Sequence, residues 1–360
     1  MKELRLMKGN EAIAEGAIRA GADGYFGYPI TPQSEIMEYL MAEKPKERTG
    51  MVVLQAESET ASINMVYGGA GCGKRVMTSS SSPGISLMQE GLSYMAGAEL
   101  PCLVVNVVRG GPGLGTIQPS QADYFQTVKG GGHGDYKLIT LAPASVQEMY
   151  DFVSLGFELA FKYRNPCMIL SDGVIGQMME KVEIGDQEPR WSDAYIREHH
   201  PWSTLGKTPD RPHNIITSLE LESSRQEKVN LKIQAKYRIL ETEEVRYEMI
   251  DCEDADYVFV AYGSSARICQ KAMELGREKG IKIGLLRPIT LYPFPVKVLH
   301  DLAGKTKGML VVEMSAGQMI EDVKLAVECR VHVEHYGRFG GIIPSPSEVL
   351  HALENQIIGG

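Results

Sequence analysis

Hydrophobic and polar positions in the first half of the chain follow two alternating patterns. Short continuous runs of apolar residues predict buried strands, and stretches of helical periodicity between them predict helices. Strands that are apolar throughout and separated by helices are typical of a parallel sheet covered on both faces. The predicted strands are 24–27, 51–55, 75–78, 102–108, 138–141 and 167–170, and the predicted helices are 10–20, 33–43, 58–68, 85–96 and 145–162.

The pattern breaks after residue 183 and resumes near residue 254. Residues 184–215 have no regular period and contain both tryptophans, which is typical of a linker. Residues 219–248 hold seven acidic and six basic side chains. They predict a solvated helix with one narrow docked face, formed by apolar residues at helical spacing, Val229, Ile233, Tyr237 and Leu240.

A second alternation of strands and helices follows this charged helix. Its predicted strands are 257–261, 282–286 and 309–313, and its predicted helices are 265–279 and 317–327. The whole pattern predicts an α/β fold with two parallel-sheet domains. We place the first domain at 1–183, a linker arm with the charged helix at 184–250, and the second domain at 251–360.

Composition excludes several classes of protein. Among 360 residues, 37 Lys and Arg face 46 Asp and Glu, and the net charge of −9 argues against a general nucleic-acid binder. No apolar run approaches the ~20 residues of a membrane-spanning helix, and we expect no secretory signal because the N-terminus lacks an apolar core. The six cysteines form no CxxC pair, so no zinc or iron–sulfur ligand run is visible. Reduced thiols and a cytoplasmic location are expected.

Polar or glycine-rich segments follow four of the predicted strands. They are YPITP (28–32), QAESE (55–59), TSSSSPG (78–84) and RGGPGLG (109–115). The carboxyl ends of parallel strands meet at one edge of a sheet, and ligands of open α/β sheets bind there. We therefore expect these segments to line one crevice.

Several side chains in these segments have two interpretations. Arg109 ends an apolar strand, where its guanidinium could grip a carboxylate or phosphate or could tie down the glycine-rich loop that follows. The serines 79–82 could cap the next helix or line an anion site. A carboxylate at the N-terminus of a helix is electrostatically favourable, and this explains Glu59. It explains Glu57 less well, because Glu57 lies at the strand–helix junction, at the mouth of the expected crevice.

Two further motifs resemble phosphate sites but fit them poorly. Residues 68–75 nearly match the P-loop pattern, but Arg75 stands where a Ser or Thr should bind magnesium, and the segment follows a helix. Asp172-Gly173 lacks the first glycine of the GDG motif of thiamine enzymes, and no Asn occurs at 195–205 to complete it. We interpret the first as a helix end and the second as a turn at the end of a strand.

The four crevice segments together resemble a known family. GYPITPQSEI, QAESETAS, TSSSSPGISLM and VVRGGPGLGT are similar to signature segments of the 2-oxoacid:ferredoxin oxidoreductases. More narrowly, they resemble the α-type chain that carries the thiamine diphosphate pyrimidine-binding domain. In the second unit, LLRPITLYPFP and VVEMSAGQM resemble the transketolase C-terminal-like domain of the same family. The resemblance covers most of the chain and leaves only the arm poorly constrained.

The resemblance implies roles for particular residues. Glu57 would hydrogen-bond the aminopyrimidine ring of thiamine diphosphate and act as the catalytic acid–base group. Arg109, helped by Thr31, would bind the carboxylate of the 2-oxoacid. No residue of this chain is expected to bind a metal. Further cofactor contacts would come from Pro29, Ile30, Ser81 and Ser82.

The resemblance also implies an active site shared between subunits. The diphosphate-binding motif, its Mg²⁺ and an iron–sulfur cluster are expected on a partner β subunit, and further clusters on a small ferredoxin-like subunit. The implied reaction converts a 2-oxoacid, coenzyme A and oxidised ferredoxin to acyl-CoA, CO2 and reduced ferredoxin. Self-association of the chain is also expected, because such domains usually pair.

The substrate expectation comes from the loop 109–136, which most resembles the 2-oxoisovalerate, or branched-chain, members. A 2-oxoglutarate-specific α subunit is the alternative, and Lys129 is the one cation that could reach a second carboxylate. A non-oxidative thiamine enzyme and a non-catalytic scaffold subunit are further alternatives. The retention of Thr31, Glu57 and Arg109 argues against the scaffold.

Overall fold

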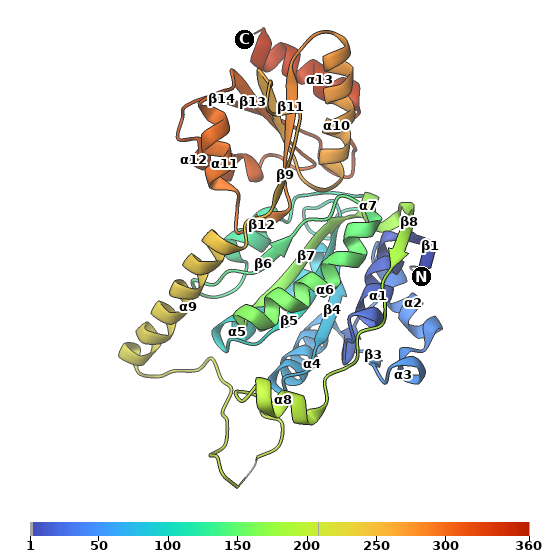
Figure 1. The fold of residues 1–360 in the computed structure, drawn as a ribbon, viewed down its shortest axis with the longest axis vertical. Coiled ribbons are helices and arrows are strands. Elements are labelled where there is room, and N and C mark those ends of the chain that lie inside the picture. Colours follow the sequence, from blue (N-terminus) through green and yellow to red (C-terminus); the bar gives the residue numbers. More distant parts are fainter. Residues whose placement is uncertain (1–2, 208, 360) are drawn as a thin grey trace.

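Two sheets organise the structure, a computed structural model that describes residues 3–207 and 209–359. Figure 1 shows them as two lobes, with the C-terminal part of the chain forming the smaller one. The larger sheet has seven strands in the order β12–β6–β7–β5–β4–β2–β3. They run parallel except for β12, which pairs antiparallel with β6. The strands are β2 (Gly24–Gly27), β3 (Val52–Gln55), β4 (Val76–Ser80), β5 (Cys102–Val108), β6 (Ile139–Leu141), β7 (Pro166–Asp172) and β12 (Thr290–Tyr292).

Helices pack on the larger sheet, and its central strands lie in the core. Every residue of β4, β5 and β7 is buried, as expected for mostly apolar strands between helical layers. Helix α1 packs against α6, and α4 packs against α5. The helices of this lobe are α1 (Gly9–Arg19), α2 (Ser34–Glu43), α3 (Pro45–Arg48), α4 (Glu59–Gly71), α5 (Ser82–Gly97), α6 (Val146–Tyr163) and α7 (Gly173–Gln177).

The smaller sheet has five strands in the order β14–β13–β10–β11–β9, parallel except for β9. The predicted α/β fold with two parallel-sheet units is therefore confirmed. The strands are β9 (Tyr247–Ile250), β10 (Tyr257–Val260), β11 (Ile283–Pro288), β13 (Gly308–Glu313) and β14 (His332–Gly337). The helices are α10 (Gly263–Glu278), α11 (Val296–Ala303), α12 (Met319–Val327) and α13 (Pro346–Leu353), followed by a π-helical turn, Glu354–Ile358.

Some strand pairs join distant parts of the chain and are absent from the sequence-based prediction. β1 (Glu3–Lys8) pairs antiparallel with β8 (Met179–Ile184). β9, in the predicted arm, extends the smaller sheet, and β12, in the predicted second domain, extends the larger sheet. Hydrophobic periodicity is a local signal and does not specify such partners. The predicted domain bounds, 1–183, 184–250 and 251–360, stay predictions.

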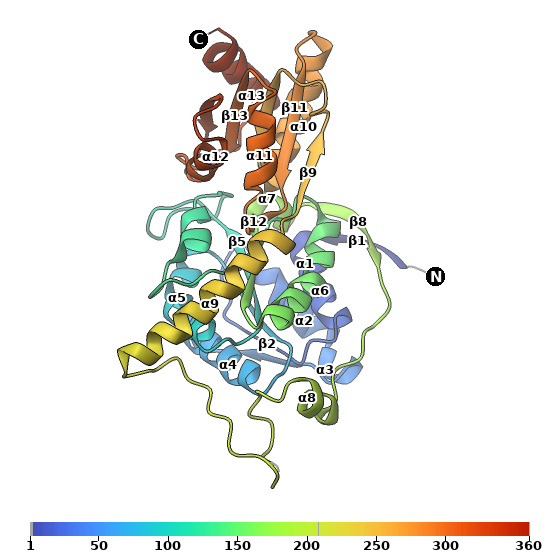
Figure 2. The same ribbon diagram turned by 60° about the vertical axis from the view of Figure 1, so that its left-hand side comes forward.

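The arm contains two helices, α8 (Asp193–His199) and α9 (Ser223–Glu243). Figure 2 shows α9 running diagonally across the larger lobe. Its buried residues are Ile233, Tyr237 and Leu240, with Val229 half-buried beside them, which confirms the predicted narrow docked face. No helix in the described part of the chain is both long and apolar enough to cross a membrane.

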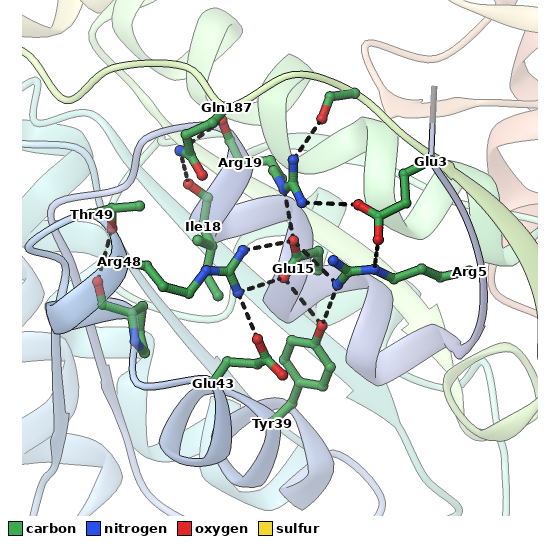
Figure 3. A network of polar contacts seen from close by, with 12 residues as sticks. Glu3, Arg5, Glu15, Ile18, Arg19, Tyr39, Glu43, Arg48, Thr49 and Gln187 are labelled. Carbon is green, nitrogen blue, oxygen red and sulfur yellow. Dashed lines mark hydrogen bonds and ion pairs between the residues drawn. The ribbon is translucent and has the colours of Figure 1, made fainter. Parts of the chain in front are cut away.

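A buried carboxylate ties the N-terminal strand to the first three helices (Figure 3). Glu15 of α1 is fully buried and lies 2.7 Å from Arg19, 3.1 Å from Arg48 and 3.6 Å from Arg5. Tyr39 of α2 donates a further hydrogen bond to it. Burial alone raises the pKa of the Glu15 carboxyl, but the hydrogen bonds from Arg48 and Arg19 outweigh burial and hold the pKa below its ordinary value. The ionised form therefore stabilises this corner of the lobe.

Candidate active site

The loops after β2, β3, β4 and β5 share one edge of the larger sheet, because these parallel strands are neighbours in the order β5–β4–β2–β3. This is the edge where the predicted crevice segments begin. It adjoins the second lobe, since Asp172, at the end of β7, accepts hydrogen bonds from the backbone N–H and the hydroxyl of Ser264 at 3.2 and 2.7 Å. The edge therefore has the position of a ligand site in an open α/β sheet.

Arg109 is the side chain that connects these loops. It follows β5 and is only 7% exposed. Its two terminal nitrogens donate to the carbonyl oxygens of Thr31, at 3.0 Å, and of Leu114, at 2.9 Å. Its backbone N–H donates to the Ser82 hydroxyl, which in turn donates to the Arg109 carbonyl. Three of the predicted site residues, Thr31, Ser82 and Arg109, are thus in direct contact.

A cavity of about 410 Å³ lies beside Arg109. Its walls come from the start of α5, from the loop after β5, and from three residues of the second lobe, Ala316, Gln318 and Phe339. Arg109 and Asp123 are the charged residues among its lining. Leu114 and Phe339 supply apolar surface at its mouth, being 79% and 66% exposed. The cavity therefore combines one guanidinium and one carboxyl group with an apolar rim.

Asp123 and Asn106 belong to this site although sequence reasoning missed both. The Asn106 amide donates to the Asp123 carboxyl at 2.9 Å, and its oxygen accepts from the Ser82 backbone N–H at 3.2 Å. Burial raises the pKa of the Asp123 carboxyl, although hydrogen bonds from Ser82 and Asn106 oppose the shift. The one available signal was Asn106 itself, a polar residue within the apolar run of β5.

The other predicted site residues lie along the same edge without joining the Arg109 cluster. Glu57 is exposed and accepts a hydrogen bond from the adjacent Ser58 hydroxyl at 2.8 Å. Pro29 is exposed, and Ile30 is half-buried. Ser81 is fully buried at the start of α5, and its side chain does not cap the helix. Their predicted cofactor contacts stay predictions.

Glu59 is a second carboxylate at the same strand–helix junction. It lies in the first turn of α4 and is only 6% exposed, in contrast to Glu57. A Cβ atom at Gly84 would lie 2.6 Å from the Glu59 carboxylate and 2.0 Å from the Ser80 hydroxyl. Glycine at position 84 is therefore what allows the turn after β4 to approach Glu59. The sequence interpretation of Glu59 as a helix-start charge fits its position, and the structure adds its burial beside the serines.

Hydroxyl groups at this edge have unused hydrogen-bonding capacity. The side-chain oxygens of Thr78, Ser80 and Ser81 are buried and have no hydrogen-bond partner within the described residues. Buried polar groups are rarely left unpaired without a reason, such as a ligand or an ordered water. Ser79, by contrast, is bound to Gln33 and Tyr25 at 2.6 and 2.7 Å. The edge therefore fits a polar ligand group better than it fits a closed core.

The side chains that could bind a metal ion do not cluster in the described residues. No group of three or more His, Cys, Asp or Glu residues could hold a metal ion in residues 3–207 and 209–359. Asp172, in the incomplete GDG-like motif, accepts from the backbone N–H groups of Val174 and Ile175 and caps α7. It is thus a turn residue at the end of a strand, as the sequence predicts. Residues 68–71 end α4, and no phosphate loop follows a strand there.

Two family models match the chain. One, described as pyruvate flavodoxin/ferredoxin oxidoreductase, thiamine diP-bdg, matches residues 15–246, and the other, pyruvate:ferredoxin oxidoreductase core domain II, matches residues 255–349. The ketoisovalerate oxidoreductase subunit VorB of Methanothermobacter marburgensis is 49% identical over 97% of this chain and 97% of its own length. The 2-oxoglutarate synthase subunit KorA of Methanocaldococcus jannaschii is 37% identical over 99% of this chain and 100% of its own length.

Solved structures have the same fold. The 2-oxoglutarate:ferredoxin oxidoreductase from Magnetococcus marinus, with 2-oxoglutarate, coenzyme A and succinyl-CoA bound, matches with a TM-score of 0.86 at 28% identity. The match covers 99% of this chain and 66% of that longer chain. A split-gene transketolase, in an inactive beta4 tetramer, matches with a TM-score of 0.59 at 13% identity over 98% of both chains, which shows likeness of fold alone.

Proposed function

The chain belongs to the 2-oxoacid:ferredoxin oxidoreductase family, and from this premise we propose that it is a subunit of a branched-chain member. The enzyme would oxidatively decarboxylate 2-oxoisovalerate to acyl-CoA and CO2 and pass the electrons to ferredoxin. The 49% identity to the VorB subunit of a ketoisovalerate oxidoreductase supports this choice of substrate.

The observation that carries the substrate proposal is the single cation in the cavity lining. Arg109 can bind the carboxylate that every 2-oxoacid carries, because a guanidinium offers parallel N–H donors to a planar anion. A second carboxylate would find no second cation there. Lys129 is ion-paired with Asp322 of α12 and does not line the cavity. The apolar rim at Leu114 and Phe339 suits an aliphatic tail.

The chain carries a thiamine diphosphate-binding domain. We propose that Glu57, Pro29, Ile30, Ser81 and Ser82 contact the pyrimidine end of the cofactor, and the unpaired hydroxyls at this edge fit that use. When bound, the cofactor supplies the nucleophilic carbon and the electron sink that decarboxylation needs. This chain would orient the ring, hold a proton at a glutamate and bind the substrate carboxylate.

The remaining components are proposed for other subunits. A partner β subunit would carry the diphosphate motif, Mg²⁺ and an iron–sulfur cluster, and a small ferredoxin-like subunit would carry further clusters. Coenzyme A, the 2-oxoacid and ferredoxin would be the reactants, in the cytoplasm. Self-association of this chain is also proposed. Its relatives are named as subunits, which supports an assembly of several chains.

A 2-oxoglutarate-specific subunit is the second candidate. Two observations favour it, namely the 37% identity to a 2-oxoglutarate synthase subunit and the match to a 2-oxoglutarate:ferredoxin oxidoreductase structure. The absence of a second cation from the lining of the described cavity opposes it. The two candidates share the family, the cofactor and Arg109, and they differ in the tail of the substrate.

We expect the complex of this chain with its partner subunits to prefer 2-oxoisovalerate to 2-oxoglutarate by at least about tenfold in kcat/KM, because the second carboxylate would be desolvated without a partner. The assay measures coenzyme A-dependent reduction of ferredoxin with each acid. Lys129→Ala is the matched variant and should leave both values unchanged. A clear preference for 2-oxoglutarate would remove the branched-chain proposal and leave the family membership intact.

A further inference from the structure

Gln318, in the turn between β13 and α12, holds a loop of the other lobe with both ends of its side-chain amide. Its Nε2 donates to the Ala122 carbonyl at 2.7 Å, and its Oε1 accepts from the Phe125 backbone N–H at 2.8 Å. It therefore binds the main chain on either side of Asp123. An amide suits this geometry because it presents one donor and one acceptor side by side.

The backbone of Gln318 is itself held in place by a buried carboxylate. Glu313, the last residue of β13, is fully buried. It accepts hydrogen bonds from the backbone N–H groups of Gln318, Met319 and Ile320 at 3.0 to 3.2 Å. It also accepts one from the Ser315 hydroxyl at 2.8 Å. The free backbone N–H groups at the start of α12 thus have a hydrogen-bond acceptor within the second lobe. This holds the main chain of Gln318 in place, and its side chain extends from there toward the other lobe.

The loop that Gln318 grips forms a wall of the Arg109 cavity. Ala122 and Asp123 line this cavity, as does Gln318 itself. From Asp123, hydrogen bonds continue through Asn106 to the Ser82 backbone. The Ser82 hydroxyl then contacts the Arg109 main chain on both sides of the residue. These hydrogen bonds, together with the main chain between Ala122 and Phe125, connect the second lobe to the residue that would bind the substrate.

Other contacts fix the same loop independently of Gln318. Gln121 donates to the Tyr262 carbonyl at 2.9 Å and accepts from Met314 N–H and the Ser265 hydroxyl. Tyr124 donates to Asp322 at 2.6 Å. Because these bonds remain when Gln318 is replaced, we expect the two lobes to stay docked. The replacement removes only the two hydrogen bonds that hold the main chain on either side of Asp123.

We propose that Gln318 is a positioning residue through which the second lobe sets the wall of the Arg109 cavity. The identity of the ligand, a 2-oxoacid, rests on the proposed function. The role of Gln318 in holding the loop at 122–125 does not depend on it. Without the Gln318 amide, the Ala122 carbonyl and the Phe125 N–H lose their partners, and the loop relaxes around Asp123. A wall that contacts the unreacting part of the substrate contributes equally to ground-state and transition-state binding, so its displacement raises KM and leaves kcat nearly unchanged.

Gln318→Met tests this proposal in the assembled complex, because Met keeps the length of the side chain and removes both hydrogen bonds. We expect the KM for 2-oxoisovalerate to rise roughly 10–100-fold, because the displaced wall no longer fits the substrate, while kcat changes less than about threefold. Hydrogen exchange of the amides at 118–130 should become faster in the substrate-free complex. Leu325→Ala, at an exposed position of α12, is the matched control and should change neither quantity.

Gln318→Glu keeps the acceptor for Phe125 N–H and removes the donor to the Ala122 carbonyl, so it tests the proposal if the Met variant does not assemble. Hydrogen exchange at 118–130 should also become faster in this variant, and this is its readout, because the added carboxylate would raise KM by charge repulsion alone. Unchanged hydrogen exchange at 118–130 would overturn the proposal, and so would faster exchange with an unchanged KM, which indicates a merely structural contact. If the wild-type complex used no 2-oxoacid, the proposed function would fail while the exchange result still decided the role of Gln318.

Discussion

Glu57→Gln is expected to lower the turnover of the assembled enzyme by roughly 100–10,000-fold, the contribution of a positioned acid–base group. An amide has the same shape as the carboxylate but cannot exchange a proton with the aminopyrimidine ring. The cofactor needs this proton exchange for its activation. Glu57 is exposed in this chain, so the variant should fold and assemble normally. The measurement is ferredoxin reduction at saturating 2-oxoisovalerate, with assembly checked by size-exclusion chromatography.

Glu59→Gln is the paired variant, and the structure makes it essential. The resemblance to the family favours Glu57, whereas burial beside Ser80 and Gly84 favours Glu59. The two glutamates lie at the same strand–helix junction, so the same measurement compares them directly. Near-normal turnover of Glu57→Gln together with a collapse in Glu59→Gln would transfer the acid–base role to Glu59.

Arg109→Ala is expected to lower kcat/KM for the 2-oxoacid by roughly 30–5,000-fold. This range corresponds to the ~2–5 kcal/mol lost when one member of a desolvated charge pair is removed. The guanidinium is almost fully buried and bridges the carbonyl groups of Thr31 and Leu114, so its loss would change the shape of the loop as well as remove the proposed substrate contact. Steady-state kinetics of the complex with varied 2-oxoisovalerate provides the measurement.

Arg109→Lys separates these two effects. A lysine can supply the charge, but its single ammonium group cannot reproduce the planar fork that donates to two carbonyl groups. We therefore expect partial recovery, with kcat/KM between those of Arg109→Ala and the wild type. Full activity of Arg109→Ala would show that the substrate carboxylate is bound elsewhere.

Much of the fold could be predicted from local sequence patterns. β2 and β5 begin and end at the predicted residues, because β2 has a glycine at each end and β5 lies between Pro101 and Arg109. α5 begins at Ser82, three residues before its predicted start. Pro83-Gly84 suggests a break, yet proline is favourable in the first turn of a helix, where its missing N–H has no intrahelical partner.

The candidate site could be predicted where residues of neighbouring strands converge, and not where distant segments meet. Thr31, Ser82 and Arg109 follow adjacent parallel strands, so the topology alone brings them together. Gln318 is 196 residues from Ala122 in the sequence, and Asp123 lies in an irregular loop without periodicity. Their place in the site depends on how the two lobes dock, which no local pattern encodes.

The same reasoning explains why β9 and β12 were not predicted. Each is a short strand, of four and three residues, that completes a sheet at its margin. β9 is mostly exposed and contains Glu248, so it forms no apolar run, and β12 is separated from β11 by a single residue. Each is held by hydrogen bonds to its neighbouring strand, β9 to β11 and β12 to β6.

The most direct test of the account is the affinity of the purified chain for thiamine diphosphate, measured by titration calorimetry with Mg²⁺ present, alone and after addition of the partner β subunit. This chain is expected to contribute only the pyrimidine half of a shared site. The chain alone should therefore show weak or undetectable binding, and the pair should bind tightly. Tight binding by the chain alone would contradict this expectation, because the chain would then contain a complete diphosphate site.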